Sequence, residues 1–172
     1  MVNLELVVKL AGIFTGLGAI AAFIYTAKSF YVSKRYFHND IELRTKQNTI
    51  EHYNKLSERY TIPLREKIAA ALGESLTDYS YTPIDKIPLT PDLCKKLVTY
   101  CRAMNRFASG ISNRVFDIET FFLVSGPPTI ALYNQISPVI SKMKVDNELG
   151  FHNELIKLVQ KLEEIQKNLP VN

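Results

Sequence analysis

The chain has 172 residues, of which 47% are hydrophobic and 22% are charged, and its formal net charge is +4 at pH 7. This length allows one modest domain plus an anchor, and the composition argues against an intrinsically disordered chain. A net charge of +4 excludes the strongly basic surface expected of a duplex nucleic-acid binder, but it suits an anionic bilayer surface or a small anionic ligand.

The first expected element is a transmembrane helix over residues 6–27. No charged residue occurs from Leu10 to Ala27, and a bilayer core needs roughly 17–25 helical residues. A buried core helix is an alternative, but this stretch has no polar face. A cleaved signal peptide is another, but its start is nearly neutral and the apolar run continues beyond the small-x-small pattern at residues 19–21. The lipid bilayer is therefore an expected partner.

The charges that flank this span predict its orientation. Lys28, Lys34 and Arg35 follow it, whereas only Lys9 precedes it among the basic residues. The positive-inside rule then places the C-terminal part in the cytoplasm. We expect a single-pass protein of the inner (plasma) membrane.

Small residues recur at four-residue spacing inside the span, and this spacing lets two helix backbones approach closely in lipid. Self-association into a homo-oligomer is the functional interpretation; the alternative is that Gly and Ala are simply common in membrane helices. The predicted packing positions are Gly12, Gly16, Gly18 and Ala22.

Residues 28–60 predict a juxtamembrane stalk helix that continues the span, and residues 61–172 predict a cytosolic helical domain. Pro63 bends the chain or starts a helix that reaches residue 72, where Gly73 fits the stop. Residues 74–91 contain three prolines without a helical period, which indicates a loop.

Three further helical regions follow the loop, so the expected fold class is all-α. Thr90 is a predicted N-cap for a helix that ends near Gly110, and Asp117 is one for residues 118–124. A Ser-Gly-Pro-Pro break separates the latter from a helix over 129–144, which Pro138 is expected to kink. Residues 148–169 carry a heptad seam, for which docking on the chain's own domain is favoured over a coiled coil between subunits.

A polar cluster around the end of the helix near Gly110 is the predicted ligand site. Two arginines four residues apart share a helix face, and a turn rich in Ser and Asn can supply hydrogen bonds to a phosphate or carboxylate. The alternative is that these arginines favour the helix dipole and cap carbonyls. The predicted site residues are Arg102, Arg106, Ser109, Ser112, Asn113 and Arg114.

No motif in the sequence predicts an enzyme, and we name no catalytic residue, cofactor or metal ligand. Phosphate-binding glycine loops and zinc-protease or serine-hydrolase motifs are absent. The histidines, His38, His52 and His152, are expected near solvent or the membrane. Cys94 and Cys101 are seven residues apart, about 10.5 Å on one helix, which is too far for a disulfide, so we expect buried thiols.

The stretch from Leu97 to Asp117, LVTYCRAMNRFASGISNRVFD, resembles a bacterial family of small membrane-anchored helical proteins of unknown function. The order of elements over residues 97–165 is similar, although Asn105 and Arg106 stand where that family often has Glu. The resemblance implies an N-terminal span and a final amphipathic helix, and it offers no catalytic residues.

The layout also resembles that of small membrane effectors of type III CRISPR defence. That resemblance implies an oligomeric sensor or effector in antiviral (phage) defence, whose cytosolic domain binds a cyclic oligonucleotide such as a cyclic oligoadenylate and perturbs the membrane. It rests on layout, size and the arginine-rich turn, and is an analogy. The alternative hypothesis is a membrane-tethered scaffold that recruits a protein partner through its terminal helix or the loop over 74–91.

Overall fold

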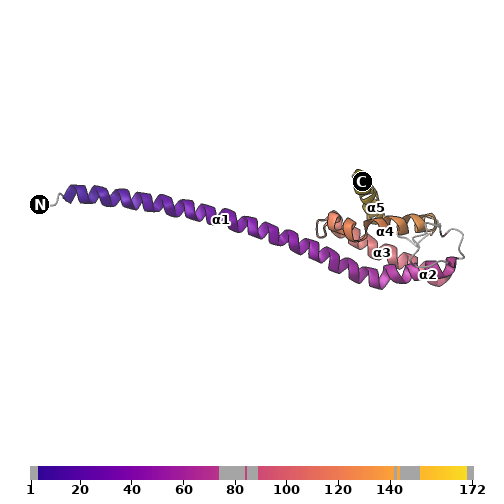
Figure 1. The fold of residues 1–172 in the computed structure, drawn as a ribbon. Helices are drawn as coiled ribbons and strands as arrows, with labels where there is room; N and C mark the ends of the chain where they lie inside the picture. Colours follow the sequence, from indigo (N-terminus) through magenta and orange to yellow (C-terminus); the bar gives the residue numbers. More distant parts are fainter. Residues whose placement is uncertain (1–3, 74–83, 85–88, 142, 144–151, 170–172) are drawn as a thin grey trace. The chain divides into compact units, whose positions relative to one another are not determined.

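The protein is all-helical in this computed structural model, which describes residues 4–73, 84, 89–141, 143 and 152–169, with side chains from Ala22 onward. No strand occurs within these residues. The elements in chain order are α1 (Leu4–Leu56), the π-helix η1 (Ser57–Thr61), α2 (Ile62–Leu72), α3 (Pro91–Ser112), α4 (Ile118–Ile140) and α5 (Asn153–Asn168) (Figure 1).

The chain divides into two units, Met1–Arg44 and Thr45–Asn172, and the boundary falls within α1. In the first unit, every described side chain from Ala22 to Arg44 is exposed. Its large aromatic side chains include Phe23, Tyr25, Phe30 and Tyr31, each more than 70% exposed.

Among the residues that the structure describes, no helix combines the length and apolar character needed to cross a membrane. The predicted span over residues 6–27 lies mostly where side chains are outside the described part, and Gly12, Gly16 and Gly18 lie there too. Ala22, the fourth predicted packing position, is exposed on α1.

The second unit begins at Thr45, whereas the sequence placed the start of the domain at residue 61. The difference arises because the end of α1 contributes to the core: Thr49, Tyr53 and Leu56 are all buried. The hydroxyl of Thr49 also accepts a hydrogen bond of 2.8 Å from the backbone N–H of Asp117, directly before α4.

The π-helix has a local cause in Pro63. In an α-helix the N–H of residue 63 would bond the carbonyl of Arg59, and proline has no N–H to give. The preceding turn is wider instead, so that the N–H of Ile62 bonds the carbonyl of Ser57, five residues back. The expected new helix after this point is confirmed as α2, and Gly73 ends it at φ 70°, a left-handed conformation that glycine adopts readily.

Side-chain caps start α3 and α4 as predicted. The Thr90 hydroxyl accepts a hydrogen bond of 3.3 Å from the N–H of Leu93, and the Asp117 carboxylate accepts one of 2.7 Å from the N–H of Thr120. The predicted break within residues 118–144 is confirmed as a kink at Ser125, whose dihedrals are not helical (φ −155°, ψ 16°), although the two halves form one element.

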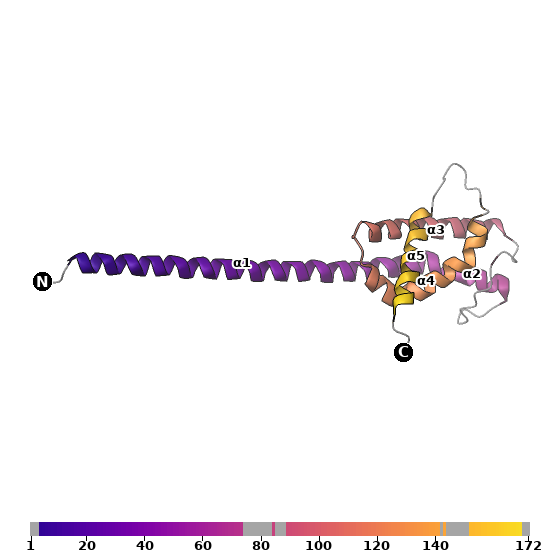
Figure 2. The same ribbon diagram turned by 90° about the horizontal axis from the view of Figure 1, so that it is seen from above.

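The core of the second unit lies between α3, α4 and α5, with the end of α1, η1 and α2 against α3. Figure 2 shows α5 lying across α3 and α4. The seam of α5 is buried against this domain, as the favoured interpretation of the heptad pattern expected: Leu155, Leu158 and Leu162 are at most 2% exposed. Residues 144–151, where that helix was predicted to begin, lie outside the described residues.

Candidate functional site

The six predicted ligand residues lie on the last turns of α3 and the turn that follows. Ser109 is half-buried. The other five are exposed: Arg102, Arg106, Ser112, Asn113 and Arg114. The side-chain amide of Asn113 donates to the carbonyl of Ser109 at 2.8 Å. The Asn113 amide thus helps to end the helix, and this N–H is not available to a ligand.

The backbone donors of the turn are also committed to ending α3. The N–H groups of Asn113, Arg114 and Val115 donate to the carbonyls of Ser109, Ile111 and Gly110 at 3.0, 3.0 and 2.8 Å. Arg114 adopts a left-handed conformation with φ 59°, which is common one residue past a helix end. A phosphate at this turn would therefore compete with bonds that hold the turn together.

The end of α3 forms a junction with the start of α5. The side-chain oxygen of Asn105 accepts hydrogen bonds from the backbone N–H groups of Glu154 and Leu155, at 2.8 and 3.1 Å. These are first-turn donors of α5, which would otherwise lack partners. Asn105 thus caps a helix 49 residues further along the chain, a role that the sequence does not announce.

A carboxylate also lies within this junction. Glu154 accepts hydrogen bonds from Lys157 at 2.6 Å and from Ser112 at 3.0 Å. These two bonds, first that of Lys157, lower the pKa of the Glu154 carboxyl below its usual value. An ionised carboxylate bonded to Ser112 opposes an anionic ligand at this position. The geometry therefore supports a structural role for this end of α3, and ligand binding there remains a prediction.

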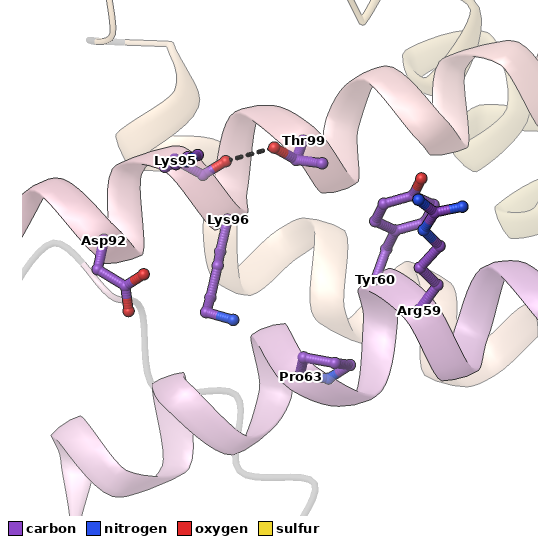
Figure 3. A pocket seen from close by; sticks show the side chains of 7 residues that line it. All are labelled: Arg59, Tyr60, Pro63, Asp92, Lys95, Lys96 and Thr99. Carbon is purple, nitrogen blue, oxygen red and sulfur yellow. Dashed lines mark hydrogen bonds between the residues drawn. The ribbon is translucent and has the colours of Figure 1, made fainter.

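A groove at the opposite end of α3 is concave and is lined by basic residues from two elements, unlike the predicted site. It has a volume of about 330 Å³ and lies between η1 with the start of α2 on one side and the first turns of α3 on the other (Figure 3). We call it the basic groove; its lining residues are Arg59, Tyr60, Pro63, Asp92, Lys95, Lys96 and Thr99.

The charges of the basic groove are predominantly positive. Three cations, Arg59, Lys95 and Lys96, line it with one carboxylate, Asp92, and Asp92 is ion-paired with Lys67 at 3.1 Å. Within the described part of the chain, no carboxylate is ion-paired with any of the three cations that line the groove. The result is a concave surface with cations from two elements and little opposing charge.

The polar and aromatic lining adds to this character. The Arg59 guanidinium lies 5.5 Å from the centroid of the Tyr60 ring. Figure 3 shows Lys96 extending from α3 toward α2, which carries Pro63, with Arg59 and Tyr60 on η1 directly before it. The Thr99 hydroxyl donates to the carbonyl of Lys95 at 2.7 Å, and its oxygen can still accept a bond. These groups can hold a phosphate-bearing molecule with a flat ring.

The thiols and histidines do not form a reactive centre in the described residues. Both cysteines are free; Cys101 is buried and Cys94 half-buried. Burial raises the pKa of Cys101 to about 12, so its thiol stays protonated. His52 is exposed as predicted, with its ring 4.9 Å from that of Phe116. The described residues contain no group of three or more side chains suited to a metal ion.

The fold and groove together define an all-helical protein whose second unit carries a positively charged, ligand-sized groove. The chain belongs to the family defined by the domain of unknown function DUF4760, whose family model matches residues 5–162. This agrees with the predicted resemblance to a family of unknown function, and the match extends beyond residues 97–165 into the N-terminal region. Neither a curated protein nor a solved structure matches the chain.

Proposed function

We propose that this protein is a membrane-anchored sensor that binds a small phosphate-bearing anion in the basic groove. Residues 6–27 would span the inner membrane, and the second unit would lie in the cytoplasm. The observation that carries the ligand proposal is that Arg59, Lys95 and Lys96 all line one groove of about 330 Å³. The anchor rests on the uncharged run and its flanking basic residues.

The lining of the groove suits a phosphate beside a flat ring, the two parts that recur in a cyclic oligonucleotide. A guanidinium can bind two phosphate oxygens at once, while lysines supply point charges to neighbouring phosphates. The Tyr60 ring, over which the Arg59 guanidinium lies, brings an aromatic group to the groove, and stacking on aromatic groups tolerates any base. A cyclic oligoadenylate combines several phosphates with flat purines, so it is the first ligand to test.

The position of the groove along the chain suggests how binding would reach the membrane. Arg59 and Tyr60 come three and four residues after α1 ends at Leu56, and α1 contains the proposed span. A ligand that closes η1 and α2 onto α3 would act on the end of that helix. In a homo-oligomer, the small residues Gly12 and Gly16 would be the contacts through which the helices repack. An effector in antiviral defence is the context that the layout favours.

The rival scaffold hypothesis has less support from the fold. One of its two surfaces was the terminal helix, and the apolar residues Leu155, Leu158 and Leu162 of that helix are buried in their own domain. Its second surface, the loop over 74–91, lies mostly outside the described residues. A partner that needs these apolar residues must displace α5 from α3 and α4, and the exposed face of α5 is the part of the terminal helix left for recruitment.

The proposal is tested by equilibrium binding to the full chain in nanodiscs of neutral lipid. A radiolabelled cyclic oligoadenylate should bind saturably, and Lys95→Gln with Lys96→Gln should weaken binding at least about tenfold, because each charge-assisted bond contributes about 1.5–3 kcal/mol. Nanodiscs of anionic lipid serve as a second arm. If the groove binds anionic lipid but not the cyclic oligoadenylate, its ligand is a lipid headgroup. If it binds neither the nucleotide nor the lipid, the proposal is contradicted.

A further inference from the structure

The part of α1 that precedes the second unit carries an exposed apolar face. Every described side chain of the first unit, from Ala22 to Arg44, is exposed. The large apolar side chains over residues 33–44 are between 46% and 71% exposed: Tyr36, Phe37, Ile41 and Leu43. A contiguous apolar surface of this kind marks a site of interaction with protein or membrane.

These four side chains lie on one side of the helix. At roughly 100° of rotation per residue, they fall within about 160° of the circumference. The other side carries only polar residues: Lys34, Arg35, His38, Asn39 and Glu42. Residues 33–44 therefore form an amphipathic stretch of helix whose apolar side is exposed.

The apolar side follows a heptad pattern. Phe23, Phe30 and Phe37 are seven residues apart, and Thr26 and Ser33 lie three residues after the first two of them. Alternating steps of three and four residues are the spacing of the positions at which two helices of a coiled coil meet. We call this row the stalk seam, and with the next two positions its members are Phe23, Thr26, Phe30, Ser33, Phe37, Asp40 and Arg44.

The stalk seam continues in register with packing positions predicted inside the span. Counting toward the N-terminus in the same heptads reaches Ala19, Gly16 and Gly12, and such small residues let helices approach closely in lipid. The whole row from Gly12 covers more than four heptads, and a pattern sustained over three to four is typical of coiled coils. The row ends after Arg44, because the next two positions, Gln47 and Glu51, are polar and exposed.

Lipid does not cover the apolar side in this arrangement. The proposed span ends at Ala27, and α1 continues from it as one helix to Leu56. At about 1.5 Å per residue, Phe37 and Leu43 lie about 15 and 24 Å beyond the span. The headgroup layer extends only about 5–8 Å beyond the hydrocarbon core on each side. The apolar side therefore needs a protein to cover it, a step that rests on the membrane anchor of the proposed function.

The charges on the stalk seam favour a second copy of the same chain. Asp40 and Arg44 are ion-paired at 2.9 Å, so the seam carries one charge of each sign. In a parallel coiled coil, Asp40 of one chain also packs beside Arg44 of the other. Tyr36 of one chain then flanks the seam opposite Ile41 of the other. We propose that residues 23–44 form a parallel, in-register coiled coil with a second copy of this chain.

Cysteine cross-linking of the full chain in membrane vesicles maps the stalk seam. Cys94→Ser removes the half-buried thiol, and Cys101 is buried. In this background Ser33→Cys should form a disulfide-linked dimer at least about fivefold faster than Arg35→Cys or Asn39→Cys, because a disulfide needs Cα atoms within about 7 Å. Equal rates at the three positions, or no dimer from Ser33→Cys, would overturn the proposal.

Extraction of the same vesicles with sodium carbonate separates this proposal from the membrane anchor. A chain that carbonate releases would contradict the anchor. The cross-linking pattern decides on the stalk seam whether or not the chain is released.

The substitution Phe37→Glu tests how much the stalk seam contributes to association. Phe37 is exposed in the single chain, so the melting temperature of the second unit should not change. The dissociation constant of the dimer in detergent should rise at least about tenfold, because association would bury two like charges. Analytical ultracentrifugation of the full chain measures this constant.

The matched control is His38→Glu, which adds the same charge among the polar residues of the other side. It should change the dissociation constant by less than about twofold. A monomeric wild type, or the same dissociation constant for both variants, would contradict the proposal.

Discussion

The two ends of α3 both carry a pair of basic residues, yet the structure gives them different surroundings. At the start of the helix, Lys95 and Lys96 line a groove together with Arg59 from another element. At the end, Arg102 and Arg106 lie on an exposed surface beside a junction whose donors and acceptors are already paired. Basic residues alone do not mark an anion site. In the basic groove the cations come from two elements, and among the described residues no carboxylate is ion-paired with them, although Asp92 also lines the groove.

The largest expected effect belongs to the junction end of α3. The Phe107 ring is 1% exposed and lies 4.9 Å from both the Phe116 and Phe121 rings. Phe107→Ala should reduce the free energy of unfolding by about 3–5 kcal/mol, because it removes a buried ring and leaves a cavity. Urea denaturation of the full chain in detergent, followed by circular dichroism, measures this loss.

The control for this prediction is Leu123→Ala on α4. Leu123 is 84% exposed, so its truncation should change the free energy of unfolding by less than about 0.5 kcal/mol. Similar losses for the two variants would mean that the aromatic cluster is not part of the core.

The next effect concerns the cap that joins α3 to α5. Asn105→Ala removes an acceptor shared by two backbone donors, and we expect a loss of about 1–3 kcal/mol in the free energy of unfolding. Hydrogen exchange at Glu154 and Leu155 should become faster. The control is Asn134→Ala, at an exposed position of α4, which should change neither the free energy of unfolding nor the exchange at these amides. An Asn105→Ala variant with wild-type stability and unchanged exchange would contradict the role of Asn105 as a cap of α5.

The smallest effect is a pH dependence at the same junction. Burial lowers the pKa of His152, so its neutral form stabilises the fold above about pH 6.5 and this contribution is lost as the pH falls. The pKa of Glu154 is also lowered, so its ionised form stabilises the fold at neutral pH, and that contribution disappears below about pH 4.5. Stability should therefore decrease on acidification in two steps.

Substitutions assign the two steps of this pH profile. Glu154→Gln should remove the more acidic step, and His152→Gln the step that begins as the pH falls below about 6.5. Glu164→Gln is the control, since Glu164 is exposed on α5 and should leave both steps in place. A profile that is flat in the wild type would contradict the role of this junction.

Much of the fold could be predicted because its causes are local. Thr90 and Asp117 are N-caps recognisable from their neighbours, Gly73 follows the last periodic residue of its helix, and the break near Ser125 is written in a Ser-Gly-Pro-Pro run. The apolar repeat of α5 likewise identified the buried seam. Each of these features depends on residues within a few positions of one another.

The candidate site could not be predicted because its residues come from distant parts of the chain. Lys95 and Lys96 are adjacent in the sequence, but nothing local indicates that Arg59 lies across from them. The role of Asn105 is hidden for the same reason, since its partners are in α5. The sequence instead favoured the arginine turn, where charges are close along the chain, although the hydrogen bonds there serve the junction.

The most direct test compares two double variants that remove the same charge from the two ends of α3. Lys95→Gln with Lys96→Gln alters the basic groove, and Arg102→Gln with Arg106→Gln alters the predicted arginine site. Binding of cyclic oligoadenylate to the full chain in neutral nanodiscs should weaken at least about tenfold in the first and less than about twofold in the second. The reverse order, or equal weakening in both, would contradict the assignment of the anion site to the basic groove.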